Sequence, residues 1–446
     1  MSLATLKRYL LHHAHAIIYF ALLYFSFQYS EVAYRREVDL SICLIAILIA
    51  CFYSLSAIHN VYSRIIGYFW LWWMLIGIAN AAAWSLLFSG SDLKVETACL
   101  IYTSLLMCFL LGVLVFDKRK ITNPLDLTVK PNSLWSFIIL VFPLIMMIES
   151  YLVLGYIPIL SGGSIIDSMY SANYGKLYGY KSVMIFSIIL SVYFTTYFNG
   201  KGKVKTVVFS ILTVLLLMIS LFDGKRVIFL CSLLSIFIYM NKLYGLGYIK
   251  RRSIYFIPII FITYTGISSL RRGNSNIVMT SVDALFYSMG VEFRDFVWTV
   301  TYYEPGTIPG YSWVSSSLGS FINGNILSIL GFDKNTLVAM DSARSWMGLF
   351  DIDLGIRTGI FSELWFEFGF FAILPAFIFG LFTSKICGDI YRATNITTLI
   401  FKLFTYAFVF FAVMGQSSLL FGVLITCIYI FILYNIIEFL TPKKRG

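Results

Sequence analysis

The sequence predicts an all-α integral membrane protein with about twelve transmembrane helices. Of its 446 residues, 59% are hydrophobic and only 12% are charged, whereas an average soluble domain carries roughly 25% charged residues. Apolar runs of about 20 residues, the length that crosses roughly 30 Å of hydrocarbon, recur from one end of the chain to the other. These observations exclude a soluble enzyme, and we expect residues 1–446 to form a single transmembrane helical bundle.

Twelve apolar segments are the expected membrane spans. The seventh and eighth are separated only by the tight turn Asp223–Arg226. The predicted spans are residues 10–29, 40–60, 65–88, 97–116, 134–154, 182–198, 206–222, 227–240, 254–270, 360–384, 397–413 and 418–440. Because their number is even, the two termini lie on the same side of the membrane.

The distribution of lysine and arginine orients this bundle. If both termini are cytoplasmic, 20 of the 33 basic residues lie on the inner side, against 7 in the short outer loops. Basic residues favour the cytoplasmic side of short loops, so both termini are predicted to be cytoplasmic. The net charge of +11 is therefore a topology signal, and no nucleic-acid partner is expected because no nucleic-acid-binding motif is present.

Two outer segments are longer than ordinary connections. Residues 155–181 form the shorter loop, and residues 271–359 form a large one of about 89 residues, well beyond the usual connection length. The large loop is rich in Trp, Tyr and Phe, a composition that predicts a structured loop rather than a disordered one. Within it, residues 282–300 read as an amphipathic helix with Arg294 opposite an apolar face. That face comprises Leu285, Met289, Phe293, Phe296, Val297 and Val300.

Basic side chains at two places on the outer side are candidates for binding an anion. Lys225 and Arg226 interrupt apolar sequence in LFDGKRVIF, and Arg271 and Arg272 directly follow a span, where outer loops tend to avoid positive charge. Guanidinium groups bind phosphate with two parallel hydrogen bonds. Alternatively, these side chains reach the lipid head groups.

A third group of charges surrounds the start of the tenth span, in DSARSWMGLFDIDLGIRTGIFSELWFEFG. It contains Arg344 and Arg357, with Glu363 just inside the span and Glu367 one turn deeper on the same face. An ionisable group at that depth normally faces a polar cavity or a partner. Glu363 is therefore a candidate general base, while Glu367 can instead pair with an arginine. A salt-bridged loop is the simpler alternative for the aspartates of this segment.

Histidine is absent from the outer loops. All four histidines fall in the first two predicted spans, so a histidine-based triad or metal site on the outer face is excluded. We expect no metal and no cofactor in this protein.

The layout resembles the bacterial O-antigen polymerases, the Wzy-type oligosaccharide repeat-unit polymerases. The residues that carry the likeness are FDGKR at 222–226, RRG at 271–273 and GIRTGIFSELWFEFGFFA at 355–372. The resemblance implies a multi-pass protein of the bacterial inner membrane, with a GT-C-like or O-antigen ligase-like bundle and one large structured periplasmic loop. Membrane lipids and a polysaccharide chain-length regulator are further candidate partners.

The resemblance also implies a reaction. The growing glycan would leave undecaprenyl diphosphate and join a sugar hydroxyl of an incoming undecaprenyl-diphosphate-linked repeat unit. Glu363 would accept the proton of that hydroxyl, and the cationic residues would bind the diphosphate and the glycan. Those residues are Lys225, Arg226, Arg271, Arg272, Arg344 and Arg357.

Three alternatives stay open. A lipid-linked oligosaccharide flippase or transporter also has many spans and cationic cavity residues, although its loops are usually short. O-antigen ligases carry a histidine ahead of the Glu-Phe-Gly segment, where this chain has Thr358. A polyprenyl-phosphate-sugar transferase would need acidic residues in the first outer loop, which holds Glu31, Glu37 and Asp39 but no adjacent acidic pair.

Overall fold

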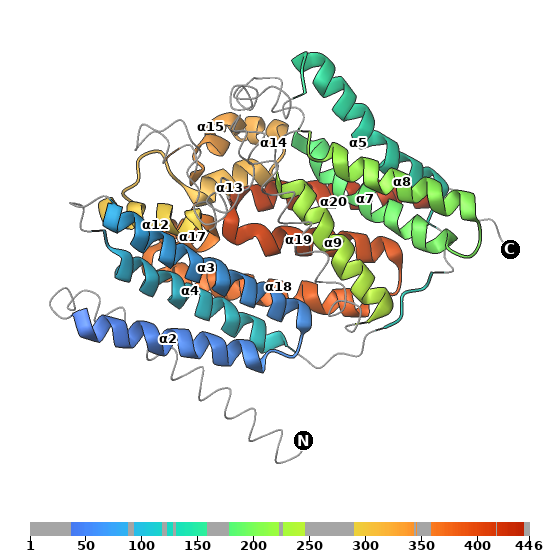
Figure 1. The fold of residues 1–446 in the computed structure, drawn as a ribbon. Helices are drawn as coiled ribbons and strands as arrows, with labels where there is room; N and C mark the ends of the chain where they lie inside the picture. Colours follow the sequence, from blue (N-terminus) through green and yellow to red (C-terminus); the bar gives the residue numbers. More distant parts are fainter. Residues whose placement is uncertain are drawn as a thin grey trace. The chain divides into compact units, whose positions relative to one another are not determined.

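The protein is all-helical wherever the computed structural model describes it (Figure 1). The described residues are 37–87, 93–117, 123–127, 131–157, 178–222, 226–245, 290–342, 345, 358–415 and 417–440, and none of them forms a strand. The chain divides into two compact units. The first comprises Met1–Lys120, Met289–Gly388 and Ala412–Leu419, and the second comprises Ile121–Ser288, Asp389–Phe411 and Leu420–Gly446.

Helices occupy ten of the twelve predicted spans, and the other two, residues 10–29 and 254–270, lie outside the described residues. The helices are α2 (Glu37–Ala57), α3 (Val61–Leu87), α4 (Val95–Phe116), α5 (Ser133–Leu154), α7 (Tyr178–Phe198), α8 (Lys203–Ile219), α9 (Arg226–Tyr244), α17 (Gly359–Phe368), α18 (Ile373–Arg392), α19 (Ile396–Phe411) and α20 (Ser418–Leu440). The tenth span is divided between α17 and α18 by the short 3-10 turn η5 (Gly369–Ala372).

Five of the described helical stretches are long and apolar enough to cross a membrane. They are Val61–Ile78, Val95–Phe116, Val227–Tyr244, Gly359–Arg392 and Ile396–Met414. Four shorter apolar helices lie at Leu44–Ala57, Ser133–Glu149, Val183–Phe198 and Leu424–Leu440. The fold is that of an all-α membrane protein, whereas the total of twelve spans and the sidedness of the loops stay predictions.

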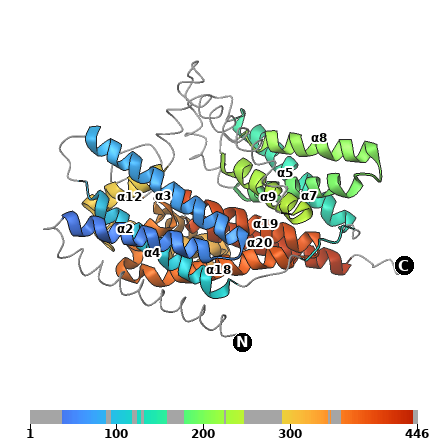
Figure 2. The same ribbon diagram turned by 60° about the horizontal axis from the view of Figure 1, so that its bottom comes forward.

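The first unit is built around α4, whose residues from Ala98 to Val113 are all buried. Helices α2 and α3 run beside α4 in both views (Figures 1 and 2). Trp70 of α3 lies with its ring centroid 4.4 Å from that of Phe109 on α4 and meets Phe361 of α17 edge to face at 5.2 Å. This aromatic contact fixes α17, and with it the candidate site, against the core of the unit.

Two glycines allow α4 and α18 to cross at very short distance. A Cβ atom added at Gly112 would overlap the carbonyl oxygen of Phe377, and one added at Gly380 would overlap the carbonyl oxygen of Phe109. Small residues at a helix crossing are characteristic of packing in membranes, where close backbone approach supplies the van der Waals contact.

The described part of the large loop contains four short helices joined by turns, and a further short 3-10 turn, η6, lies farther along the chain. These elements are α12 (Val291–Tyr302), α13 (Trp313–Phe321), α14 (Gly324–Ile329), α15 (Lys334–Ala339) and η6 (Ala412–Met414). The predicted amphipathic helix over 282–300 corresponds to α12, which begins after Gly290 in the left-handed conformation, while residues 282–289 lie outside the described part of the chain. The shorter loop, 155–181, is described only at its two ends.

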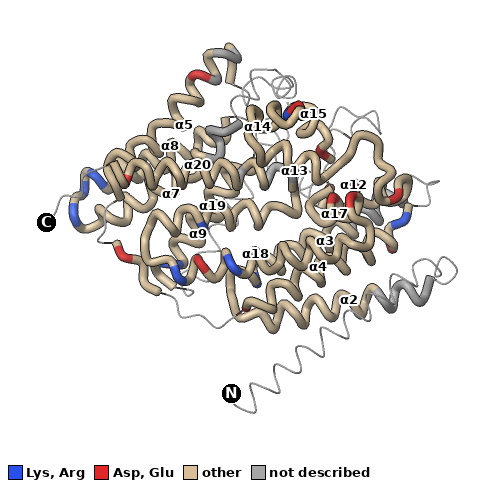
Figure 3. The backbone as a smooth tube through the Cα atoms, turned by 180° about the vertical axis from the view of Figure 1, so that it is seen from behind, with Lys and Arg blue, Asp and Glu red and all other residues tan. Residues whose placement is uncertain are grey.

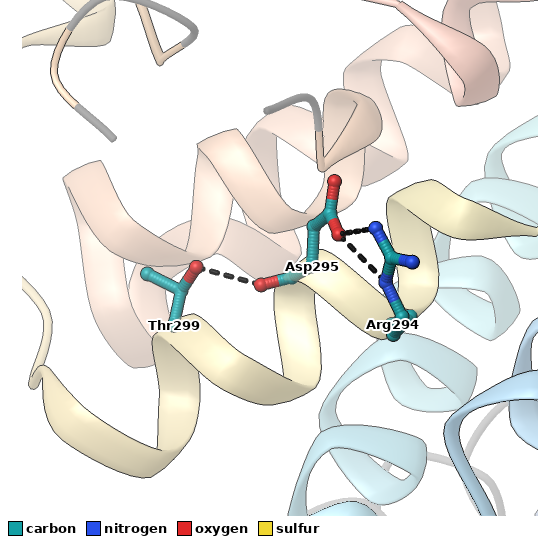
Figure 4. A network of polar contacts seen from close by, with 3 residues as sticks. All are labelled: Arg294, Asp295 and Thr299. Carbon is teal, nitrogen blue, oxygen red and sulfur yellow. Dashed lines mark hydrogen bonds and ion pairs between the residues drawn. The ribbon is translucent and has the colours of Figure 1, made fainter. Parts of the chain in front are cut away.

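Helix α12 buries the predicted apolar face and two polar residues besides. Phe293, Phe296 and Val297 are buried as expected, but Asp295 and Thr299 are buried too, because α12 packs against α3, α4 and α17. Figure 4 shows how the polar groups are satisfied. Both Nε and Nη2 of Arg294 donate to Oδ1 of Asp295, at 3.0 and 2.7 Å, and the Thr299 hydroxyl donates to the Asp295 carbonyl at 2.7 Å. The helix is therefore enclosed on more sides than its sequence pattern indicates.

In the second unit, α7 packs against α5, α8, α9 and α19. Hydrogen bonds between hydroxyl groups join these helices, for example Thr196 of α7 and Tyr239 of α9 at 2.7 Å.

Charged residues are sparse along the helices and gather near their ends (Figure 3). At the turn between α7 and α8, the ammonium group of Lys201 lies 4.2 Å from the centroid of the Tyr197 ring. This distribution of charge suits helices that lie in lipid.

Candidate functional site

Glu363 lies in the middle of α17 and is almost completely buried, with 1% of its surface exposed. The helix begins at Gly359, whose φ of +77° only glycine adopts readily. A Cβ atom at this position would also overlap the carbonyl oxygen of Val413 in η6. The start of α17 is thus pressed against η6, and this close approach brings the Glu363 carboxylate to the connection between η6 and α20.

Three donors surround the Glu363 carboxylate. Oε1 accepts a hydrogen bond from the Ser342 hydroxyl, while Oε2 accepts one from the Ser417 hydroxyl and one from the Ser417 backbone N–H at 2.7 Å. The Ser417 oxygen in turn accepts a hydrogen bond from the Trp313 indole N–H at 2.6 Å. A carboxylate in such a place is tolerated only when its oxygens are hydrogen-bonded. Glu363 therefore joins three segments that are distant in sequence.

Tyr311 contacts the main chain of Glu363, where its hydroxyl donates to the Glu363 carbonyl at 2.7 Å. Burial, followed by the negative charges of Glu363, Glu367 and Asp341, raises the pKa of Tyr311 well above its ordinary value. The phenol consequently stays protonated near neutral pH and acts there as a donor.

Glu367, one turn farther along α17, serves the start of α13. Its Oε1 accepts from the Ser312 hydroxyl at 3.1 Å and from the Val314 N–H at 3.3 Å, and its Oε2 accepts from the Trp313 N–H at 2.9 Å. A carboxylate at a helix N-terminus satisfies free N–H groups and interacts favourably with the helix dipole. Glu367 is thus a cap for α13, and its predicted pairing with an arginine stays a prediction because Arg344 and Arg357 lie outside the described residues.

A buried hydroxyl without a hydrogen bond among the described residues lies at the start of α17. Thr358 precedes α17 and is fully buried, and its Oγ1 makes no hydrogen bond within the described residues. The Thr358 carbonyl, by contrast, accepts a hydrogen bond from the hydroxyl of Ser362, the neighbour of Glu363. Within the described residues, Thr358 is thus a buried hydroxyl next to the start of α17 without a hydrogen bond of its own.

Of the seven predicted site residues, Glu363 is the one whose side chain the structure describes. Helix α9 begins at Arg226, but the Arg226 side chain lies outside what is described. The others fall on residues that are not described, namely Lys225, Arg271, Arg272, Arg344 and Arg357. Along the chain, Arg344 lies two residues after Ser342, which bonds to Glu363, and Arg357 directly precedes Thr358. The predicted cationic half of the site stays a prediction.

The partners of Glu363 were not predicted from the sequence. Ser342 and Ser417 are 21 and 54 residues away from it, and serine is too common in loops to stand out there. Tyr311 and Trp313 are two of the many aromatic residues in the large loop, and nothing in the sequence distinguishes them. In the part of the chain that the structure describes, no group of three or more His, Cys, Asp and Glu side chains could hold a metal ion.

Comparisons with protein-family models, with curated proteins and with solved structures find no match to this chain.

Proposed function

We propose that this protein is a polysaccharide polymerase of the bacterial inner membrane that joins lipid-linked oligosaccharide repeat units on the periplasmic face. The observation that carries the proposal is the setting of Glu363. This carboxylate is buried, and each of its oxygens accepts a hydrogen bond from a serine hydroxyl. It lies in the segment that resembles the Wzy-type polymerases.

In the proposed reaction, a hydroxyl oxygen of the incoming repeat unit attacks the anomeric carbon of the growing glycan. The new glycosidic C–O bond forms as the C–O bond to undecaprenyl diphosphate breaks, and the bonding electrons leave with the diphosphate. The hydroxyl proton passes to the Glu363 carboxylate and then to water. No oxidant, reductant or nucleotide sugar is needed, because the energy of the transfer resides in the glycosyl diphosphate.

The hydrogen bonds of Glu363 are compatible with this role. The Ser342 hydroxyl already presents an O–H group to Oε1, so a sugar hydroxyl that replaced it would meet the carboxylate in the same manner. Ser417 would continue to hold Oε2 through its backbone N–H and hydroxyl. A base held in this way keeps a fixed direction toward the acceptor, and a positioned base contributes roughly 10²–10⁴-fold to rate.

The leaving group calls for positive charge rather than for an acid. Arg344 and Arg357 lie close in sequence to Ser342 and Thr358, respectively, and Arg271 and Arg272 belong to the same predicted loop. Arginine binds diphosphate oxygens with paired hydrogen bonds and stabilises the charge that develops on them.

The proposal is tested with purified protein in nanodiscs, supplied with undecaprenyl-diphosphate-linked repeat units and EDTA but without nucleotide sugar. A ladder of lengthening glycans on a gel is the expected result. If no ladder forms with a range of repeat units, and the lipid-linked glycan instead crosses the bilayer of proteoliposomes, the protein is a flippase. In a parallel reaction with added lipid A, transfer of a single glycan to that acceptor, without a ladder, would indicate a ligase.

A further inference from the structure

Helix α13 is inside out compared with a helix on the surface of a soluble protein. Its buried side carries Ser316, Ser317 and Gly319, with Ser316 only 1% exposed, whereas Val314 and Leu318 are exposed. In water the opposite arrangement is favoured, because burial of apolar surface drives folding. An element with polar and small residues inside and apolar residues outside matches a lipid environment.

The buried small residues of α13 permit close packing against α15. A Cβ atom added at Gly319 would lie 2.8 Å from the Cβ of Leu337 and 3.0 Å from the backbone nitrogen of Val338. The hydroxyls of Ser316 and Ser317 make no hydrogen bonds among the described residues, so their small size is what they contribute here. Helices in lipid pack through small residues in this way.

Helix α14 continues the apolar exposure. Ile326, Ile329 and Leu330 follow the i, i+3, i+4 spacing of one helical face, and all three are exposed, Ile329 to 85%. The turn that displays them is well defined. The N–H groups of Gly331 and Phe332 donate to the carbonyls of Ser328 and Leu327, at 3.1 and 2.9 Å, which is the Schellman arrangement of a helix end.

This apolar surface is attached to a membrane-spanning stretch. Glu367 of α17 caps α13, and the N–H of Gly306 donates to the Phe366 carbonyl at 2.9 Å. Helix α17 is the first part of the candidate span Gly359–Arg392, so α13 begins beside residues that enter the membrane. At 1.5 Å per residue, the nine residues of α13 extend about 14 Å, too short to cross roughly 30 Å of hydrocarbon.

We infer that α13 and α14 are embedded in the lipid at the membrane surface, with their exposed apolar side chains among the acyl chains. The exposed side chains concerned are Val314, Leu318 and Phe321 of α13, with Ile326, Ile329 and Leu330 of α14 and its C-terminal end. The occupant of this apolar surface is bilayer lipid, since transfer of these exposed apolar side chains from water into the acyl chains is favourable and α13 is bound to a candidate membrane span. The large loop is thereby held against the membrane, next to the Glu363 site, where a lipid-linked substrate would arrive.

The test uses fluorophore labels on single introduced cysteines in the full-length protein, reconstituted in nanodiscs. Ile329→Cys and Leu318→Cys report on α14 and α13, and Asn335→Cys, an exposed polar position on α15, is the matched control. Labelling of the unsubstituted chain is subtracted. Each label is quenched either by lipids with a nitroxide on the acyl chain or by iodide in the water.

We expect the lipid nitroxide to quench the labels at positions 318 and 329 at least about twofold more strongly than the label at position 335. Iodide should quench the labels at 318 and 329 less than the label at 335. Iodide quenching at 318 and 329 equal to that at 335 would overturn the inference, because the surface would then face water. Protection from both quenchers would also overturn it, since another segment or another copy of the chain would then cover the surface. If one cysteine variant fails to fold, the other decides the outcome.

Discussion

Replacing Ser417 by alanine isolates the hydroxyl that joins Glu363 to Trp313. Alanine keeps the backbone N–H bond to Glu363 but removes the O–H donor, and it leaves the Trp313 indole N–H without its acceptor. A hydrogen bond to a charged group contributes about 1.5–3 kcal/mol, and a buried donor left unsatisfied costs about 1–3 kcal/mol. Allowing for partial relaxation, we expect the free energy of unfolding to fall by about 3 kcal/mol.

The assay is reversible unfolding in mixed micelles with increasing SDS, followed by tryptophan fluorescence. Ser328→Ala, at an exposed serine on α14, is the control and should change the free energy of unfolding by less than about 0.5 kcal/mol. In a Trp313→Phe background, Ser417→Ala should cost about 1–3 kcal/mol less, because no indole N–H remains to be left unpaired. A loss below about 1 kcal/mol, or strict additivity of the two substitutions, would refute the shared hydroxyl.

Three further outcomes are expected. Gly112→Ala forces a methyl group into a carbonyl oxygen of α18 and should lower the free energy of unfolding by about 3 kcal/mol in the same assay. The control is Gly202→Ala, whose added Cβ meets nothing within 4 Å, and an equal cost for both substitutions would contradict the close crossing of α4 and α18. Glu367→Ala removes the cap of α13 and should lower the free energy of unfolding by about 1–2 kcal/mol. Glu367→Gln should have a smaller effect because one acceptor oxygen remains, and equal effects of the two substitutions would argue against capping. The pKa of Asp333 is below its ordinary value because of the hydrogen bonds that its carboxylate accepts at the start of α15. The stabilisation by Asp333 is therefore present at neutral pH and is lost as the pH falls through that lowered pKa. The difference in Tm between the wild type and Asp333→Asn should shrink from pH 7 to pH 3, and a constant difference would contradict this.

The positions of the helices followed from the sequence because a membrane restricts the choice. An apolar run of about 20 residues in lipid has to satisfy its own backbone hydrogen bonds, and a helix does so within the run. The interruption of the tenth span was missed. Gly369, the first residue of η5 after the end of α17, adopts a φ of +55°, yet in the sequence it is one glycine among apolar residues. Local pattern does not reveal which glycine adopts a special backbone conformation.

The site was predictable only in part, for a similar reason. Glu363 stood out because a carboxylate within an apolar segment is costly and needs an explanation. Its partners come from loops brought close by tertiary packing, and Ser342 and Ser417 carry no local signal. Glu367 has the same sequence context as Glu363, but its contacts give it a different role, since it faces the start of α13. Spacing along a helix predicts a shared face, not what the face meets.

The inside-out polarity of α13 shows another limit of sequence patterns. Its sequence, WVSSSLGSF, reads as an ordinary amphipathic turn of a loop, and nothing in it says which side is buried. Tertiary packing decides the orientation, which buries Ser316 and leaves Leu318 exposed.

The central claim, that Glu363 is the base of a glycan polymerase, is tested most directly by Glu363→Gln in the nanodisc polymerisation assay. Glutamine preserves the size of the side chain and one acceptor oxygen, so the variant should remain folded. Its SDS unfolding midpoint, measured alongside, checks this. We predict that its initial rate of ladder formation falls by roughly 10²–10⁴-fold, while Glu367→Gln retains most of the activity. A folded Glu363→Gln protein that polymerises at the wild-type rate would contradict the claim and leave Glu363 as a structural link between Ser342 and Ser417.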